Sequence, residues 1–292
     1  MSKKSAIALS SAPRRRKSMR RQPPGRRWWD GPWLMVGSIG VVAAAILAII
    51  VVSQRQPTAS LPSRSELATV LDQVTQVPPE VFNAIGSGGT NSRLTPDTPP
   101  TPIQGKPKVH YVGAEFCPYC ASERWSLIVA LSRFGTFENL RASQSSADDV
   151  YPNTPTFTFD GSQYTSPYVD FVAVETATRE HTPLQRLSAE QQALMAANNP
   201  VGSIPFVDIA GQVHSVGSGV DTSLLVGRTW PDIAARLSDP TDRATRSIIG
   251  NANHVTAAIC QATGNQPAAV CSSPAVVGLT VQSPSQGSGG AL

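Results

Sequence analysis

The fold of this chain is decided by residues 108–120, which read KVHYVGAEFCPYC. The first part, 108–113, is short and largely apolar, as expected for a buried strand. Residues 121–134 follow with apolar side chains at helical spacing, and Gly135 supplies a helix stop. A strand that leads into a helix therefore places two cysteines, three positions apart, at the helix N-terminus.

That position favours thiol-disulfide exchange. The free N-H groups and the dipole at a helix N-terminus stabilise an anion, so the thiol of Cys117 is predicted to ionise more readily than a free cysteine. Cys120 lies one turn deeper and can attack a mixed disulfide formed at Cys117. Pro118 suits an early helical position, where its missing N-H needs no partner. We predict Cys117 and Cys120 as the catalytic pair, with Pro118 and Tyr119 between them in contact with substrate.

Two simpler interpretations of the pair stay open. A Cys-x-x-Cys motif is half of a zinc site, but the remaining cysteines, Cys260 and Cys271, are eleven positions apart. The four histidines form no paired cluster in the sequence: His110, His181, His214 and His254. No metal site and no cofactor are therefore expected. The other interpretation is a purely structural disulfide, which gains little from closing so short a loop.

A second stretch, residues 202–209 (GSIPFVDI), reads as a strand that opens with a proline. Ala210 and Gly211 then separate it from another predicted strand at 212–216. With the first stretch, this pattern resembles the thioredoxin fold. The resemblance implies that Pro205 follows a cis peptide bond and that the backbone of Ile204 pairs with substrate. An ordinary edge-strand proline is the alternative.

Longer stretches resemble an uncharacterised family of membrane-anchored, thioredoxin-like prokaryotic proteins. The likeness covers about residues 64–272 and is carried by 109–135, 150–157 and 257–260. It implies fold and membrane placement, but no substrate. Tyr111 stands where thioredoxins usually have a buried acid, whereas Glu115 matches an acid common two positions before the first cysteine. Glu115 is therefore a candidate proton relay, with a solvated loop carboxylate as the alternative.

Residues 33–52 are twenty uncharged, mostly apolar positions within an uncharged run from 31 to 54, long enough to span a bilayer. We predict a transmembrane helix at 33–54 that follows a basic cytoplasmic tail at 1–32. A cleavable signal peptide is the alternative, although the apolar core is long and the basic region extended.

Charge is distributed unevenly about this segment. Ten Lys and Arg residues and one acid precede it, a net charge of +9, which leaves 14 basic and 19 acidic residues after it, a net charge of −5. By the positive-inside rule, the N-terminus is cytoplasmic and the cysteines lie outside the cytoplasm. Topology explains the basic tail, and no interleaved aromatics or nucleic-acid-binding fold accompany it, so no nucleic-acid partner is expected.

The remaining chain predicts a tether, short helix and Gly/Pro-rich linker at 55–107, then a thioredoxin-like α/β domain at 108–272. Within 55–107, a short helix is expected from 64 to 85 with one apolar face, formed by Leu67, Val70, Leu71 and Val74. Residues 273–292 form a predicted disordered tail, rich in Ser, Pro and Gly after Gln282.

The domain is larger than a minimal thioredoxin fold, and the excess lies between Cys120 and Pro205. We expect an inserted hairpin of 156–159 and 164–165 about an Asp160-Gly161 turn, then a strand at 168–175. Ser188 and Gln191 form a predicted capping box for a helix that ends near Asn198.

The second cysteine pair, Cys260 and Cys271, follows an apolar helical run at 248–259. A structural disulfide that fastens the C-terminal segment is expected, since disulfides persist outside the cytoplasm. A relay disulfide that exchanges with Cys117 and Cys120 is the alternative.

Other chemistries lack their motifs: there is no P-loop, no dinucleotide-binding glycine pattern, no H-E-x-x-H and no G-x-S-x-G. The leading hypothesis is a membrane-anchored, extracytoplasmic oxidoreductase that acts on protein thiols or disulfides, with a membrane redox protein as a further candidate partner. Alternatives are a non-enzymatic assembly or binding subunit of a membrane complex, and a peroxide reductase that works through Cys117.

Overall fold

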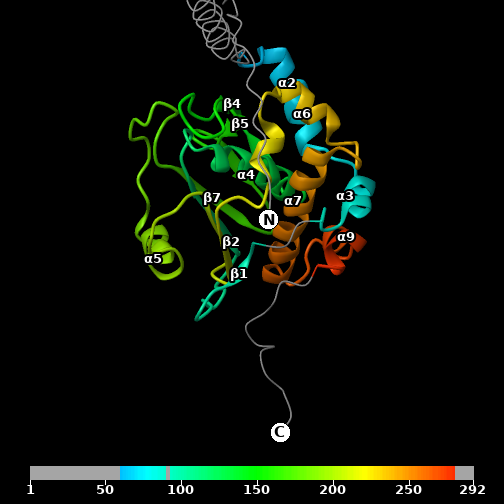
Figure 1. Cartoon of the computed structure of the whole chain (residues 1–292). Helices are drawn as coiled ribbons and strands as arrows, with labels where there is room; N and C mark the ends of the chain where they lie inside the picture. Colours follow the sequence, from blue (N-terminus) through cyan, green and yellow to red (C-terminus); the bar gives the residue numbers. More distant parts are fainter. Residues whose placement is uncertain (1–59, 90–92, 280–292) are drawn as a thin grey trace, which may run out of the picture. The chain divides into compact units, whose positions relative to one another are not determined.

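A computed structural model describes residues 60–89 and 93–279 (Figure 1). The described residues all belong to one compact unit. The expected cytoplasmic tail and transmembrane helix lie outside the described residues. Within residues 60–89 and 93–279, no helix has both the length and the apolar character needed to cross a membrane.

The described part is a mixed α/β structure with eight α-helices. Its elements, in chain order, are α2 (Arg64–Thr75), α3 (Pro79–Ile85), β1 (Thr95–Pro96), β2 (Lys108–Gly113), α4 (Pro118–Leu131), β3 (Thr136–Glu138), β4 (Arg141–Gln144), β5 (Pro155–Thr158), β6 (Gln163–Thr165), β7 (Asp170–Glu175), α5 (Ala189–Asn198), β8 (Phe206–Ile209), β9 (Val213–Val216), the 3-10 helix η1 (Thr222–Leu225), α6 (Trp230–Arg236), α7 (Arg243–Ala262), α8 (Ala268–Cys271) and α9 (Pro274–Val277).

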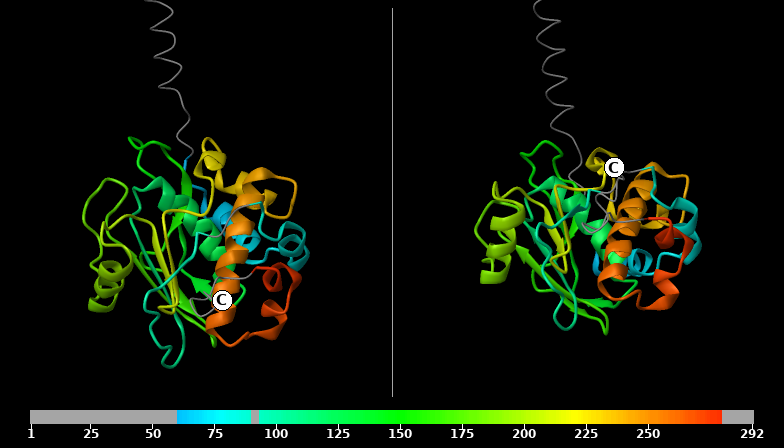
Figure 2. Two further views of the ribbon diagram at one scale, coloured as in Figure 1. Left: turned by 60° about the horizontal axis from the view of Figure 1, so that its bottom comes forward. Right: turned by 90° about the horizontal axis from the view of Figure 1, so that it is seen from below.

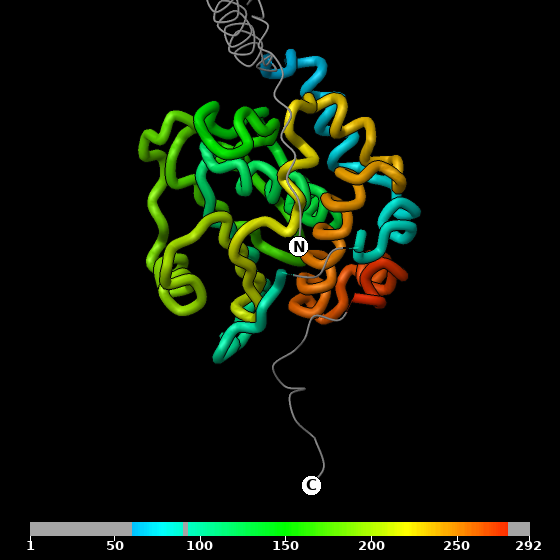
Figure 3. The backbone as a smooth tube through the Cα atoms, viewed as in Figure 1, coloured from blue at the N-terminus to red at the C-terminus, as the bar shows by residue number. Residues whose placement is uncertain are grey.

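Five strands form one mixed sheet in the order β1-β9-β8-β2-β7. β2 is parallel to β7 and antiparallel to β8, and β9 is antiparallel to both β8 and β1. The β8-β9 hairpin turns at Ala210 and Gly211, whose φ values of 59° and 63° suit a tight turn, and Gln212 completes a three-residue loop between the paired residues Ile209 and Val213. Figure 3 shows the chain around β1 beside β8 and β9, so part of the expected linker adds an edge strand to the sheet.

Helices lie on both faces of this sheet (Figure 2). Side chains alternate across a strand, so Val109 and Tyr111 of β2 join the apolar core with α4 and α7. Lys108 and His110 point the other way and line a cavity together with residues of α5. One face of the sheet is therefore the main core, whereas the other carries polar groups.

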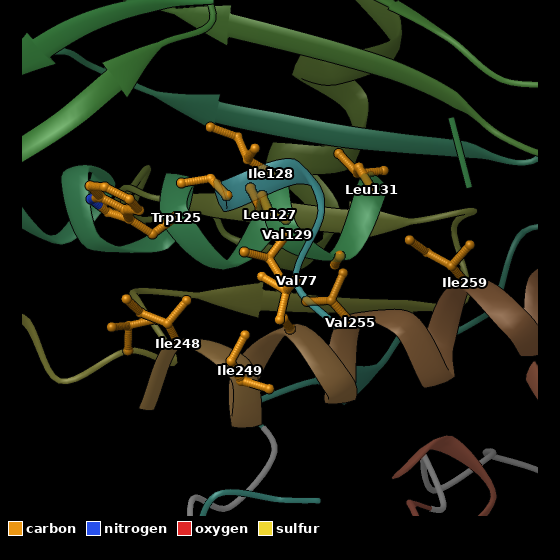
Figure 4. Packing of buried hydrophobic residues seen from close by; sticks show 14 of the residues in the cluster. Val77, Trp125, Leu127, Ile128, Val129, Leu131, Ile248, Ile249, Val255 and Ile259 are labelled. Carbon is orange, nitrogen blue, oxygen red and sulfur yellow. The ribbon is translucent and has the colours of Figure 1, made fainter. Parts of the chain in front are cut away.

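Helix α4 is the centre of the core. Nearly all its residues are buried, which fits its apolar sequence and central place. Figure 4 shows side chains of α4 packed toward α7, including Val129 opposite Val255. Trp125 packs edge-on against Phe157 at 4.8 Å between ring centroids, and its indole N-H donates to Pro155 O at 2.8 Å. These contacts fix the axis of the helix that carries the Cys-x-x-Cys motif.

The expected helix at 64–85 is in fact two helices, α2 and α3. Pro78 and Pro79 separate them, because proline lacks a backbone N-H and disfavours helical conformation in the residue before it. Val70 and Val74 of α2 are buried in the same core as α4 and α7. Residues 64–85 therefore belong to the same compact unit as the domain expected at 108–272.

The expected hairpin about Asp160 and Gly161 is wrong. β5 pairs with β4 and β6 pairs with β3, so each strand has a partner earlier in the chain. Gly161 has the positive φ of 73° that a turn requires, but the turn only bends the second arm of a longer ribbon. A local turn signal cannot exclude such earlier partners. Arg141 of β4 holds the turn against its own strand by donating to Asp160 Oδ2 at 3.0 Å.

Three other expectations hold. β7 covers most of the predicted strand at 168–175, and α5 ends at Asn198. The Ser188 and Gln191 capping box is present in both directions.

The segment expected to be disordered after residue 272 instead contains α9, with Ala275 and Val276 buried, so the ordered chain extends at least to residue 279.

Candidate functional site

Cys117 caps the N-terminus of α4. Its backbone is extended (φ −75°, ψ 121°), and its Sγ accepts a hydrogen bond from the backbone N-H of Cys120 at 3.3 Å. Pro118 occupies the first helical position, where its missing N-H leaves no bond unmade. The sulfur of Cys117 therefore meets the free N-H groups of the helix end, as the sequence predicts.

The loop before β8 faces this sulfur. The Ile204–Pro205 peptide bond is cis, as the resemblance implies, and Cys117 Sγ lies 3.9 Å from Ile204 O. Pro205 O accepts from Gly217 N at 2.8 Å, which ties the loop to the end of β9. The fold thus brings together two motifs separated by 87 positions in the sequence.

The pKa values of the two thiols are shifted in opposite directions. The pKa of Cys117 is lowered, chiefly by its hydrogen bond with Cys120 and against the effect of burial, with further help from the Cys120 N-H and Arg124. Burial raises the pKa of Cys120 well above its ordinary value, and the neighbouring Cys117 adds to the rise. Cys117 is therefore the thiol that ionises first, and Cys120 the one that holds its proton.

A hollow of about 670 Å³ lies beside the pair. Tyr119, Tyr151 and Ile204 line one part, and the loop from Gly217 to Thr222 lines another. Tyr119 is 43% exposed and its ring packs edge-on against Tyr151, with the centroids 5.9 Å apart. Cys117 is only 5% exposed and does not itself line the hollow, whereas its neighbours Tyr119 and Ile204 do.

Glu115, the predicted proton relay, is half-buried before α4. Its backbone N-H donates to Ala177 O at 2.9 Å. Within the described residues, no hydrogen bond joins its carboxylate to the sulfur of Cys117 or Cys120. The relay stays a prediction that no contact in the described part supports.

Two buried charged residues of α4, Glu123 and Arg124, lie near the cysteine pair and were not singled out from the sequence. Glu123 is 2% exposed and accepts from Ser218 Oγ and Gly219 N, each at 2.9 Å, so it holds the loop that lines the hollow. Its other oxygen accepts from Asn251 Nδ2 at 2.9 Å. Burial raises the pKa of Glu123 and these hydrogen bonds oppose the rise.

Arg124 is fully buried and paired with Glu175 of β7. Its Nε and Nη2 donate to the two carboxylate oxygens at 2.8 and 2.6 Å, and Nη2 also donates to Ala114 O at 2.7 Å. A sequence signal did exist for both residues: adjacent charged positions inside a helix with no polar face must be paired in the core.

Cys260 and Cys271 form the expected disulfide, with Cα atoms 5.5 Å apart, and it joins the end of α7 to α8. Cys117 and Cys120 are not joined by a disulfide in this structure. In residues 60–89 and 93–279, no three His, Cys, Asp or Glu side chains converge as a metal site would require.

The described part is thus a mixed α/β protein with a Cys-x-x-Cys pair at a helix N-terminus, facing a cis proline. Residues 100–202 match the model of a family described as a domain of unknown function (DUF929). This match includes β2, the cysteine pair and α5, and it ends before Ile204 and Pro205. No curated protein and no solved structure matches the chain.

Proposed function

We propose that the described part is a thioredoxin-like domain that exchanges disulfides with protein thiols. Two features of the fold support the family resemblance. The strands β7, β2, β8 and β9 are neighbours with one parallel and two antiparallel pairings, and α4 follows the central strand directly. The observation that carries the proposal is the 3.9 Å approach of Cys117 Sγ to Ile204 O beside the cis proline.

Two exchanges would complete one cycle. In the reducing direction, the Cys117 thiolate attacks a substrate disulfide, forming a mixed disulfide and expelling one substrate sulfur as a thiolate. Cys120 then gives up its proton and attacks Cys117 Sγ. A bond between the two cysteine sulfurs forms, the bond from Cys117 to substrate breaks, and the second substrate thiolate leaves. The oxidising direction reverses these steps.

The acidities favour the oxidising direction. A thiolate stabilised at Cys117 stabilises the reduced pair, and a pair whose reduced form is stabilised is a stronger oxidant. The backbone of Ile204 would pair with an extended substrate segment, while Pro118 and Tyr119 would contact it from the helix end. Substrates would then be polypeptides that carry free thiols.

We place this chemistry outside the cytoplasm, on a single membrane anchor at residues 33–54. The uncharged run and the excess of basic residues before it support this topology. The Cys260–Cys271 disulfide fits a compartment in which disulfides persist.

Trapping tests the function. In Cys120→Ser, Cys117 can still attack the disulfide of an oxidised polypeptide, which expels one polypeptide sulfur as a thiolate, but the mixed disulfide cannot be resolved. Polypeptides that carry disulfides should therefore remain attached until a reductant is added. Cys117→Ser in the same preparation is the control and should trap none. If Cys120→Ser retained no disulfide-linked polypeptide, the result would contradict the proposal.

The alternative is an assembly subunit that keeps the fold but performs no exchange. The low exposure of Cys117 and Cys120, 5% and 0%, favours it. Equilibration of the native protein with glutathione buffers, followed by thiol alkylation, separates the two functions. A pair that changes oxidation state in the folded protein supports the enzyme. A pair that changes only after unfolding supports the subunit.

A further inference from the structure

The guanidinium of Arg124 is held toward the cysteines. Arg124 follows Cys120 by four positions on α4, so the two side chains share one face of the helix. Helical side chains lean toward the N-terminus, which directs that of Arg124 back toward the pair. It reaches Ala114, whose carbonyl oxygen accepts from Arg124 Nη2 at 2.7 Å and from the backbone N-H of Cys117 at 3.3 Å.

Hydrogen bonds fix the orientation of the ion pair between Arg124 and Glu175. Glu175 lies on β7, and its Oε1 also accepts from Phe159 N at 3.4 Å. Arg124 Nη1, in contrast, is buried without a hydrogen-bond partner in the described part of the chain, and the same holds for the hydroxyl of Tyr111. An N-H donor that makes no bond in the resting site is available to an anion that forms during a reaction.

Among the titratable groups near Cys120, Arg124 supplies the charge that favours the Cys120 thiolate. Tyr111 of β2 stays neutral, because burial raises the pKa of its hydroxyl well above the ordinary value. Glu175 offsets part of the positive charge of Arg124, and Arg124 is the member of the pair that lowers the pKa of the Cys120 thiol. Cys117 is bonded to substrate sulfur when Cys120 must ionise. Consistent with this geometry, Arg124 lowers the pKa of both Cys117 and Cys120.

We infer that Arg124, oriented by Glu175, stabilises the thiolate that Cys120 becomes when it attacks the mixed disulfide. The inference rests on the proposed exchange function and deepens it. Cys120 first gives its proton to solvent, which leaves a thiolate beside Arg124. This thiolate attacks Cys117 Sγ, a bond between the two cysteine sulfurs forms, the bond from Cys117 to substrate breaks, and the substrate sulfur leaves as a thiolate. A buried cation would then favour ionisation of Cys120 by electrostatic stabilisation, in place of the proton transfer predicted for Glu115.

A two-step reaction of the full-length protein with dithiobis(nitrobenzoate) isolates the step. Attack by Cys117 releases one nitrothiobenzoate, and attack by Cys120 on the resulting mixed disulfide releases the second. The rate of the second release, followed against pH, reports the ionisation of Cys120. Cys120→Ser should give only the first release.

The double variant Arg124→Met, Glu175→Leu removes both charges without leaving either one buried alone. We expect the pH midpoint of the second release to rise by about one unit. Its rate at neutral pH should fall about threefold, since a tenfold smaller thiolate fraction is partly offset by the greater nucleophilicity of a more basic thiolate. Arg133→Met is the matched control. It removes a partly buried arginine that follows the end of α4 and donates to Asn253 Oδ1 and Ser273 Oγ, each at 3.3 Å, so it should leave the midpoint unchanged.

A second variant makes the opposite prediction and keeps the hydrogen-bonding shape of the pair. Glu175→Gln leaves Arg124 uncompensated, so the midpoint of the second release should fall. A midpoint that is unchanged or moves the other way in Glu175→Gln, or that is unchanged in the folded double variant, would overturn the role of Arg124. Absence of any second release from the unmodified protein would instead overturn the exchange function itself.

Discussion

The two cysteine pairs of this protein are equally hidden but chemically unlike. Cys117 and Cys271 are each 5% exposed, and Cys120 and Cys260 are exposed by no more than 1%. Cys117 caps the N-terminus of α4, whereas Cys260 lies near the C-terminus of α7. A helix N-terminus stabilises a thiolate and a helix C-terminus does not. The two pairs therefore differ in the helix end at which they lie and not in burial, and under the proposed function this difference separates a reactive pair from a structural one.

The largest expected effect comes from Cys117→Ser. Because the thiolate is the nucleophile, this change should abolish exchange with glutathione and with protein thiols. The measurement is the rate of disulfide exchange with a reduced test polypeptide. Folding should be retained, as shown by an unchanged circular dichroism spectrum. Residual exchange that depends on Cys260 or Cys271 would reverse the roles assigned to the two pairs.

Removal of the second pair should affect stability instead. The double change Cys260→Ser, Cys271→Ser opens a loop with a sequence separation of 11, for which chain entropy predicts a loss of about 3 kcal/mol in the free energy of unfolding. Urea unfolding measures this loss. Exchange by Cys117 and Cys120 under native conditions should be unaffected. A large drop in exchange by the folded variant would show that the second pair acts as a relay.

Glu123→Gln should have a smaller effect that is confined to the first site. Glutamine presents one acceptor oxygen in place of two, so part of the set formed by Ser218, Gly219 and Asn251 loses its partner, at a cost of about 1 to 2 kcal/mol. The loop beside Ile204 is held less firmly, so exchange with polypeptide substrates should slow severalfold. Reaction with small thiols should change less. Equal slowing for small thiols and polypeptides would contradict a docking role for the loop.

The smallest effect concerns acidity. Cys120→Ala removes the hydrogen bond that contributes most to the lowered pKa of Cys117, so that pKa should rise toward its ordinary value. The pH dependence of iodoacetamide alkylation measures it. Because the folded pKa of Cys117 is below its unfolded value, the folded state binds fewer protons between them. The Cys117 contribution to stability of the reduced protein therefore increases with pH in that window, and Cys120→Ala should weaken the increase. An unchanged alkylation midpoint would assign the acidity to the helix end alone.

The sequence predicted most of the elements that position the site. The strand at 108–113, the helix that follows the cysteines, the proline-led hairpin and the Ser188 capping box depend on local patterns, and each is present. The failures are also instructive. The Asp160-Gly161 turn was recognised, but its strands pair with earlier segments, because strand pairing depends on partners that a local pattern does not name.

By itself, the sequence determined the identity and spacing of the reactive groups. Two thiols three positions apart at a predicted helix start, and a distant Ile-Pro step, can be read from local chemistry because each depends only on neighbouring residues. The tertiary structure alone decided which buried charges surround those thiols. The pairing of Arg124 with Glu175, and of Glu123 with the loop at Ser218, joins segments 51 and 95 positions apart. Only chain folding determines such contacts, since a buried charge requires a partner but its sequence does not say which one.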